Sequence, residues 1–145
     1  MQEKFFARTW AEIDLSAICK NYHTVRASVA PESSVCAVVK ADAYGHGVGK
    51  VAPTLSSEGV DCFAVSCLSE AEELRALGIE LPILILGYTP CEFAATLTKH
   101  NFIQTVYSLD YAEDLSACAV ENGVSVKCHI KLDTGMSRLG FDVSE

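Results

Sequence analysis

The feature that most constrains the fold is a regular repeat of short apolar runs along the chain. These runs begin near Val35, Asp61, Pro82, Phe102 and Val124, about 20 to 26 residues apart. That spacing is filled by one strand, one helix and two short connections. The repeat therefore predicts five βα units and a parallel sheet, because strands that run the same way need a crossover between them.

The segments between the apolar runs predict helices with recognisable ends. Ser16 and Ser108 are predicted to cap the first and last helices, since a serine side chain can accept from the first free backbone amides. Ser69 and Glu72 have the spacing of a capping box. Residues 10–14 predict an additional strand ahead of the repeat.

Two architectures fit this repeat. A closed (β/α)8 barrel has eight units and typically about 250 residues, whereas this chain has 145. An open, doubly wound sheet of five strands fits the length without further units. The periodicity alone does not separate them, so both remain open at this point.

Charge and cysteine content narrow the choice of partners. The net charge is −8, which disfavours binding to nucleic acid or to an anionic membrane. The seven cysteines have no C-x-x-C spacing, which favours free thiols in a reducing compartment and no metal site. The opening MQEKFFARTW lacks the features of a signal peptide, and residues 81–87 are too short to span a membrane. We expect a cytoplasmic protein.

The segment CAVVKADAYGHGVG places a lysine where α/β proteins build their sites. The first run ends at Lys40, and a loop with three glycines follows. The carboxyl ends of parallel strands form the binding edge of such sheets. A lysine amine can react with an aldehyde, although a lysine after a strand is also typical of a solvated rim. Tyr44, four residues later, carries a hydroxyl that can donate to a phosphate.

The segment VKCHIKLDTGMSRLGF alternates between apolar and polar residues. One face carries the polar side chains Lys127, His129, Lys131 and Asp133. This stripe fits an exposed edge strand, or a strand whose polar face points into the mouth of a barrel. In the second case Lys131 is expected to be a buried cation near Arg138. Neutralising Lys131 or converting it to an anion would then relieve the repulsion.

Two of these segments resemble motifs of one enzyme family. AVVKADAYGHG closely resembles the cofactor-lysine signature of alanine racemases, and KLDTGMSRLG resembles their KxDTGMxRLG motif, with Ser137 where some members have glycine. TWAEIDLSAICKNY resembles the family's opening, so the resemblance covers nearly the whole chain. It implies an α/β fold, a partial (β/α)8 TIM barrel with about five of eight units. Residues 1–145 would be the N-terminal portion of the barrel that binds pyridoxal 5′-phosphate, the remaining strands and a C-terminal β domain lying outside this sequence.

The resemblance also implies roles for four residues. Lys40 would carry pyridoxal 5′-phosphate covalently and act as one of two acid/base groups. Tyr44 would help to hold the cofactor phosphate. Arg138, on a neighbouring strand, would contact the cofactor's phenolic oxygen and the substrate, and Lys131 is a candidate carbamylated lysine. The second base in this family is a tyrosine from the partner subunit of a homodimer, outside this sequence.

The activity implied is the interconversion of L-alanine and D-alanine, which supplies D-alanine for peptidoglycan. The 145-residue chain alone is expected to be inactive. A serine racemase or a broad-specificity amino-acid racemase is an alternative of the same class. A non-catalytic barrel protein that binds pyridoxal phosphate is an alternative of another class, against which the DTGMSRLG segment speaks.

Overall fold

The computed structural model describes residues 9–142. Residues 1–8 and 143–145 lie outside that range. The prediction about a signal peptide depends mainly on residues 1–8, and residues 143–145 belong to the predicted barrel portion. Within residues 9–142, no helix is long and apolar enough to cross a membrane.

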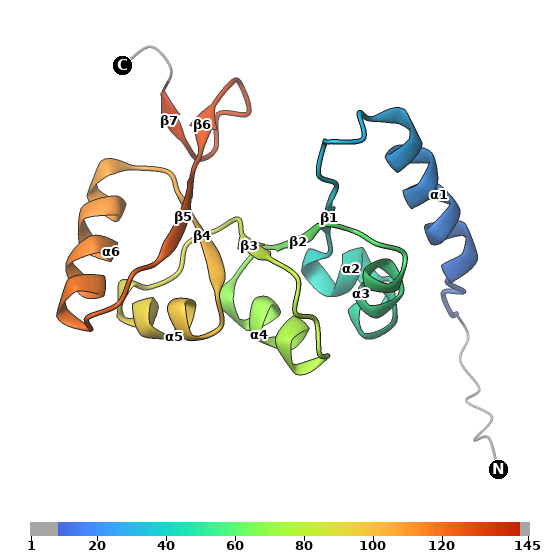
Figure 1. The fold of residues 1–145 in the computed structure, drawn as a ribbon, viewed down its shortest axis with the longest axis horizontal. Helices are drawn as coiled ribbons and strands as arrows, with labels where there is room; N and C mark the ends of the chain where they lie inside the picture. The colour runs from blue at the N-terminus through green and yellow to red at the C-terminus, as the bar shows by residue number, and fades with distance from the viewer. Residues whose placement is uncertain (1–8, 143–145) are drawn as a thin grey trace.

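A five-stranded parallel sheet follows the predicted repeat (Figure 1). Its strands are β1 (Cys36–Val38), β2 (Cys62–Val65), β3 (Ile83–Ile85), β4 (Phe102–Val106) and β5 (Lys127–Ile130). They lie side by side in chain order, and every pairing is parallel. This order fits a segment of a barrel, because a doubly wound sheet reverses its strand order at a switch point. The five predicted parallel strands and the helical crossovers between them are confirmed, and β5 is followed by two short strands rather than by a fifth helix within residues 9–142.

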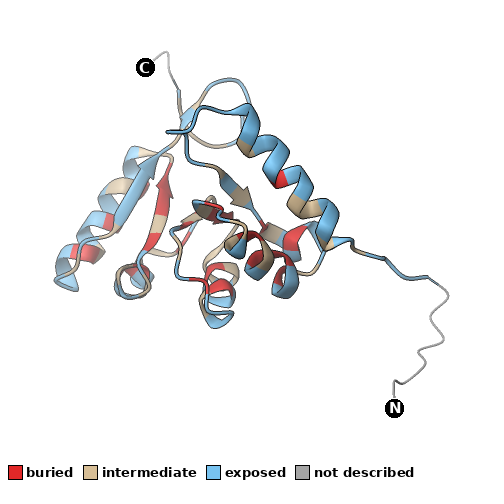
Figure 2. Cartoon of the chain, turned by 45° about the vertical axis from the view of Figure 1, so that its right-hand side comes forward, coloured by how far each residue is buried: buried red, intermediate tan, exposed pale blue. Residues whose placement is uncertain are grey.

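Helices pack against this sheet, and its opposite face is partly exposed at β1. The helices are α1 (Leu15–Ser28), which packs against α3, α2 (Lys40–Gly45), α3 (Val48–Ser57), α4 (Leu68–Ala76), the short 3-10 turn η1 (Cys91–Phe93), α5 (Ala94–Lys99) and α6 (Leu109–Glu121). Neighbouring strands present Phe63, Ile83 and Phe102 in register, and all three are fully buried. Val38, by contrast, is 40% exposed. Figure 2 shows buried residues gathered where strands and helices meet.

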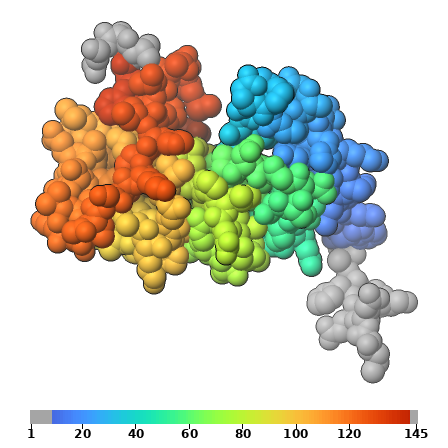
Figure 3. All heavy atoms as spheres, viewed as in Figure 1, coloured from blue at the N-terminus to red at the C-terminus, as the bar shows by residue number. Residues whose placement is uncertain are grey.

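A small second sheet follows β5. Strands β6 (Leu132–Asp133) and β7 (Phe141–Asp142) pair in parallel, and they bracket the loop that carries the DTGMSRLG segment. The amide of Phe141 donates to the carbonyl of Lys131 at 2.9 Å, which closes the base of this loop. Figure 3 shows that successive parts of the chain lie next to one another across the molecule, with this loop region in red at one end.

The start of the first helix differs from the prediction. Asp14, rather than Ser16, is the capping residue, and its Oδ1 accepts from the amides of Ser16 and Ala17 at 2.8 and 3.2 Å. The predicted strand at residues 10–14 is wrong, because none of these residues pairs in a sheet and Trp10 is 76% exposed. Apolar residues that find no neighbouring strand cannot form a ladder, whatever their pattern.

The capping predictions for two other helices had different outcomes. The capping box at Ser69 and Glu72 is wrong, since α4 begins at Leu68 with Cys67 in the capping position. The Ser108 cap is confirmed, because its side chain accepts from the amide of Tyr111 at 3.3 Å.

Candidate functional site

Lys40 stands at the carboxyl edge of the sheet. Strand β1 ends at Val38, one residue before the buried Val39, and Lys40 is the first residue of α2. The Lys40 side chain is half-buried. Among the residues that the structure describes, none forms a hydrogen bond or ion pair with its ammonium group. The amine is therefore positioned by the strand and remains available to a group from outside the chain.

The turn after Lys40 is left-handed. Residues 41–44, which include no glycine, have φ between 50° and 58° and ψ between 34° and 54°. Such a conformation costs roughly 1–2 kcal/mol per residue for L-amino acids. It persists only where the surroundings hold it in place. No sequence pattern predicts it, since neither alanine nor tyrosine prefers this region.

Hydrogen bonds from three sides hold this turn. Inside it, the amide of Ala43 donates to the carbonyl of Val39 at 2.9 Å. Ahead of it, the Oδ1 of Asp42 accepts from the amide of Val48 at 2.6 Å, at the start of α3. From α4, a carboxylate oxygen of Glu70 accepts from the amide of Ala41 at 2.8 Å. Sequence reasoning missed both carboxylates, although Glu70 lies in the first turn of a helix whose start is predicted nearby.

Tyr44 ends the left-handed turn and faces outward. Its side chain is 58% exposed, and its hydroxyl has no partner within residues 9–142. The glycines that follow differ in their roles. Gly47 has φ 87° and precedes α3, so its conformation requires glycine. Gly49 lies inside α3 without a positive φ.

A pair of thiols lies across β1 and β2, at the start of the two strands. Cys36 lies opposite Cys62 in the β1–β2 register. Burial, aided by the neighbouring Cys62, raises the pKa of the Cys36 thiol to about 12. Cys36 therefore stays protonated at neutral pH and is a poor nucleophile.

The polar stripe of the fifth strand lies on an edge. All four residues of β5 are exposed, so the edge-strand interpretation describes this segment in the present chain. Lys131 is half-buried rather than buried, and its Nζ donates to the carbonyl of Leu139 at 2.6 Å. Arg138 is exposed, and no described residue forms a hydrogen bond or ion pair with its guanidinium. The expected burial of the Lys131 cation is therefore corrected.

Asp133 organises the loop that carries Arg138. Its Oδ1 accepts from the amides of Gly135 and Ser137, each at 3.0 Å. These two hydrogen bonds hold the pKa of the Asp133 carboxyl below its ordinary value. At the end of the loop, a side chain at Gly140 would meet the Asp133 amide at 2.7 Å. In this motif the aspartate and the glycine therefore shape the loop that presents the arginine.

Lys40 and Arg138 follow strands at opposite edges of the sheet. Lys40 follows β1 and Arg138 lies beyond β5, with β2, β3 and β4 between them (Figure 1). The expectation that the guanidinium comes from a neighbouring strand is therefore wrong. Both groups do lie beyond the carboxyl ends of their strands. Further strands that closed the sheet would bring these ends around one mouth.

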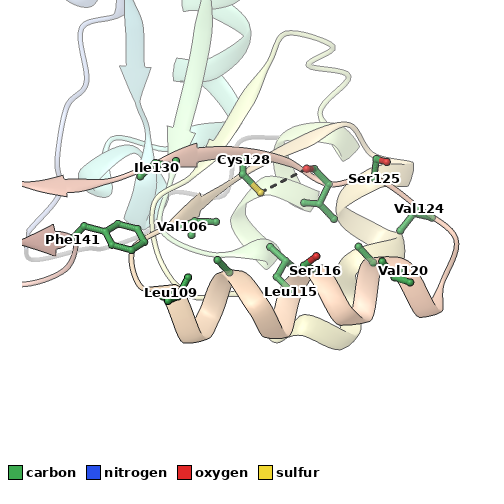
Figure 4. A pocket seen from close by; sticks show the side chains of 13 residues that line it. Val106, Leu109, Leu115, Ser116, Val120, Val124, Ser125, Cys128, Ile130 and Phe141 are labelled. Atoms are coloured by element: carbon green, nitrogen blue, oxygen red, sulfur yellow. Dashed lines mark hydrogen bonds between the residues drawn. The ribbon is translucent and has the colours of Figure 1, made fainter. Parts of the chain in front are cut away.

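An apolar hollow of about 580 Å³ lies elsewhere, between α6 and β5 (Figure 4). Leu115, Val120, Ile130 and Phe141 are among its lining residues, and none of the lining residues is charged. It shares no residue with the Lys40 turn. Without a charged side chain it offers nothing that would recognise a phosphate or an amino acid, so the lysine edge remains the candidate site.

A sequentially ordered parallel sheet with candidate functional residues beyond the carboxyl ends of its strands is typical of the (β/α) barrel enzymes. Residues 13–145 match the family described as alanine racemase, N-terminal domain, and the chain belongs to that family.

Individual relatives agree with this assignment. The chain is 48% identical to alanine racemase 1 of Clostridium acetobutylicum over 132 residues, which cover 91% of the chain and 34% of that relative. An alanine racemase structure from Clostridium difficile 630 superposes with a TM-score of 0.86 at 42% identity, covering 96% of the chain and 37% of its own. A histidine racemase structure from Leuconostoc mesenteroides superposes with a TM-score of 0.82 at 27% identity, covering 88% of this chain and 34% of its own. The chain thus spans about a third of the length of these relatives.

The residues present fit a phosphate-bearing aldehyde cofactor. A half-buried amine without a partner can bond to an aldehyde carbon. The exposed Tyr44 hydroxyl, four residues away on a firmly held turn, can donate to a phosphate oxygen. Lys40 and Tyr44 would hold such a cofactor, which would supply an electron-withdrawing group when bound.

Proposed function

We propose that residues 1–145 are the N-terminal portion of the barrel of a pyridoxal-phosphate-dependent alanine racemase, with further barrel strands and a C-terminal β domain outside this sequence. The observation that carries the proposal is the half-buried Lys40 amine at the carboxyl edge of the sheet, which has no hydrogen-bond or ion-pair partner among residues 9–142. Membership of the alanine racemase family supports the assignment of this amine.

Each residue of the site has a proposed task. Lys40 binds the cofactor and, once released from it by the substrate, moves a proton at the α-carbon on one face. Tyr44 donates to the cofactor phosphate, and Arg138 contacts the cofactor ring oxygen and the substrate. Racemisation requires a second acid/base group on the opposite face, which we assign to the partner subunit of a homodimer. The product, D-alanine, would supply peptidoglycan synthesis.

Covalent labelling of the full-length protein tests the Lys40 assignment. Wild type mixed with pyridoxal phosphate should gain a visible absorption band, and borohydride should fix the label on the peptide that contains Lys40. Lys40→Ala should lose both the band and the label. Lys50→Ala is the matched control, because Lys50 is exposed on the neighbouring α3. A label that persists in Lys40→Ala refutes the assignment.

The isolated 145-residue chain should show no racemase activity, because it lacks the opposite-face group. Activity from a preparation whose intact mass matches 145 residues would refute this part of the proposal.

A racemase for another amino acid is the second candidate function. The structural likeness to a histidine racemase favours it, since the same fold serves a different substrate there. Serine and broad-specificity racemases belong to this candidate. Initial rates on L-alanine, L-serine and L-histidine separate these possibilities. A non-catalytic pyridoxal-phosphate-binding barrel would accept the label on Lys40 but racemise none of the three.

Two further expectations stay predictions. Carbamylation of Lys131 would replace a cation with an anion beside Arg138, and a carbamate carbon signal after incubation with ¹³C-bicarbonate would detect it, with Lys131→Met as the control. Fractionation of cells that express the full-length protein would test the cytoplasmic location.

A further inference from the structure

Glu70 links the lysine turn to the neighbouring strand. It lies in the first turn of α4, its side chain is half-buried, and its two carboxylate oxygens accept from different segments. Oε1 accepts from the amide of Ala41 at 2.8 Å, and Oε2 accepts from the amide of Ser66 at 2.7 Å. One carboxylate therefore spans the carboxyl ends of β1 and β2.

The amide of Ala41 belongs to the peptide bond that joins it to Lys40. Fixing that peptide plane fixes the backbone of Lys40 on its carboxyl side, and so the direction in which its side chain leaves the chain. The hydrogen bond from the Ala41 amide to Glu70 also lies at the start of the left-handed turn of residues 41–44. L-residues do not adopt this left-handed conformation without support from their surroundings. Hydrogen bonds to a charged carboxylate are stronger than neutral ones, so Glu70 is suited to hold a strained start.

We propose that Glu70 is a positioning residue for Lys40. It sets the aim of the amine and the hand of the turn that carries Tyr44, without touching substrate or cofactor itself. This inference rests on the proposed function of Lys40. It goes beyond that function by assigning to α4 a part in the site.

A helix-capping role alone explains only half of the geometry. Contact with Ser66, just ahead of α4, resembles the way an acidic side chain in the first turn satisfies a free amide there. The bond to Ala41 reaches 29 residues back along the chain and adds nothing to that helix. A purely capping residue would leave the Lys40 turn unaffected when it is replaced.

Glu70→Gln in the full-length protein is the test, because an amide keeps one acceptor oxygen and cannot satisfy both backbone amides. Glu70→Ala is the stronger variant, and it also strips α4 of its contact with Ser66. Glu73→Gln is the matched control, since Glu73 is exposed on the same helix and loses the same charge. Two quantities are measured: hydrogen exchange of the Ala41 amide without cofactor, and the rate at which pyridoxal phosphate with borohydride labels Lys40.

In Glu70→Gln we expect the Ala41 amide to exchange about tenfold faster than in wild type, and Lys40 to be labelled more slowly. Glu73→Gln should match wild type in both. Unchanged exchange, or faster exchange with unchanged labelling, refutes the positioning role alone. If pyridoxal phosphate does not label Lys40 in wild type, the proposed function itself fails, and the positioning role fails with it.

Discussion

Replacing Gly87 by alanine should separate the carboxyl ends of β2 and β3. Gly87 follows β3, and its amide donates to the carbonyl of Ser66 at 3.0 Å. A Cβ at position 87 would lie 2.5 Å from that same oxygen, whereas an ordinary carbon–oxygen contact is about 3.3 Å or more. The strands must therefore part by roughly 0.8 Å, which stretches the hydrogen bond beyond a useful length.

The cost follows from these distances. A hydrogen bond lost at a half-buried position costs about 1–3 kcal/mol, and forcing an extra methyl into packed backbone costs about as much. We expect Gly87→Ala to lower the free energy of unfolding by about 2–6 kcal/mol. The hydrogen bond that Gln104 Nε2 donates to the Gly87 carbonyl at 2.7 Å should weaken as well.

Gly49→Ala provides the matched comparison, because it adds the same methyl group to a helix. The nearest atom to a Cβ at position 49 is Leu77 Cδ2 at 4.0 Å, which is an ordinary contact. Alanine should therefore stabilise α3 by about 0.5 kcal/mol. Urea unfolding of the full-length variants, followed by circular dichroism, measures both changes. If Gly87→Ala is as stable as wild type, or Gly49→Ala is the less stable of the two, the steric reasoning is refuted.

Three other substitutions probe single hydrogen bonds. Tyr111→Phe removes the buried hydroxyl that donates to the carbonyl of Thr89 at 2.8 Å, and urea unfolding should show a loss of about 1–2 kcal/mol; Tyr88→Phe, at an exposed ring, should change little. Asp42→Ala removes the carboxylate that accepts from the Val48 amide at the start of α3 and should cost about 1–2 kcal/mol, seen as faster hydrogen exchange at the start of that helix. The pKa of the Asp133 carboxyl is lowered from its ordinary value of 3.8. The stability that this carboxylate gives to the loop is therefore complete above pH 3.8 and is lost as the pH falls through the lower folded-state pKa. Exchange in residues 134–139 should accelerate across that acid range, and Asp133→Asn should abolish the acceleration.

Local pattern predicted the strands because each apolar run is short and is bounded by polar or glycine residues. Phe102 begins β4 at the position where its run begins, and Lys40 lies two residues beyond the last residue of β1. The Ser108 cap was predictable for the same reason, since a serine side chain and the amide of Tyr111 lie within one turn of each other.

The features that sequence reasoning missed depend on partners distant along the chain. The left-handed turn at residues 41–44 depends on Glu70 from α4, and the backbone preferences of alanine and tyrosine do not predict it. The relation of Lys40 to Arg138 depends on strand order, which periodicity does not encode. The strand expected at residues 10–14 failed because a strand requires a neighbour, and no segment of residues 9–142 pairs with it.

The sequential order of the strands bears on how the protein is made. In the five-stranded sheet, each strand after β1 pairs with the one synthesised just before it, so a nascent strand leaving the ribosome finds its partner already present. Only one crossover of the chain separates such partners, so the entropy of closure is smaller than for strands that are distant in sequence. Growth from the amino end can therefore proceed unit by unit.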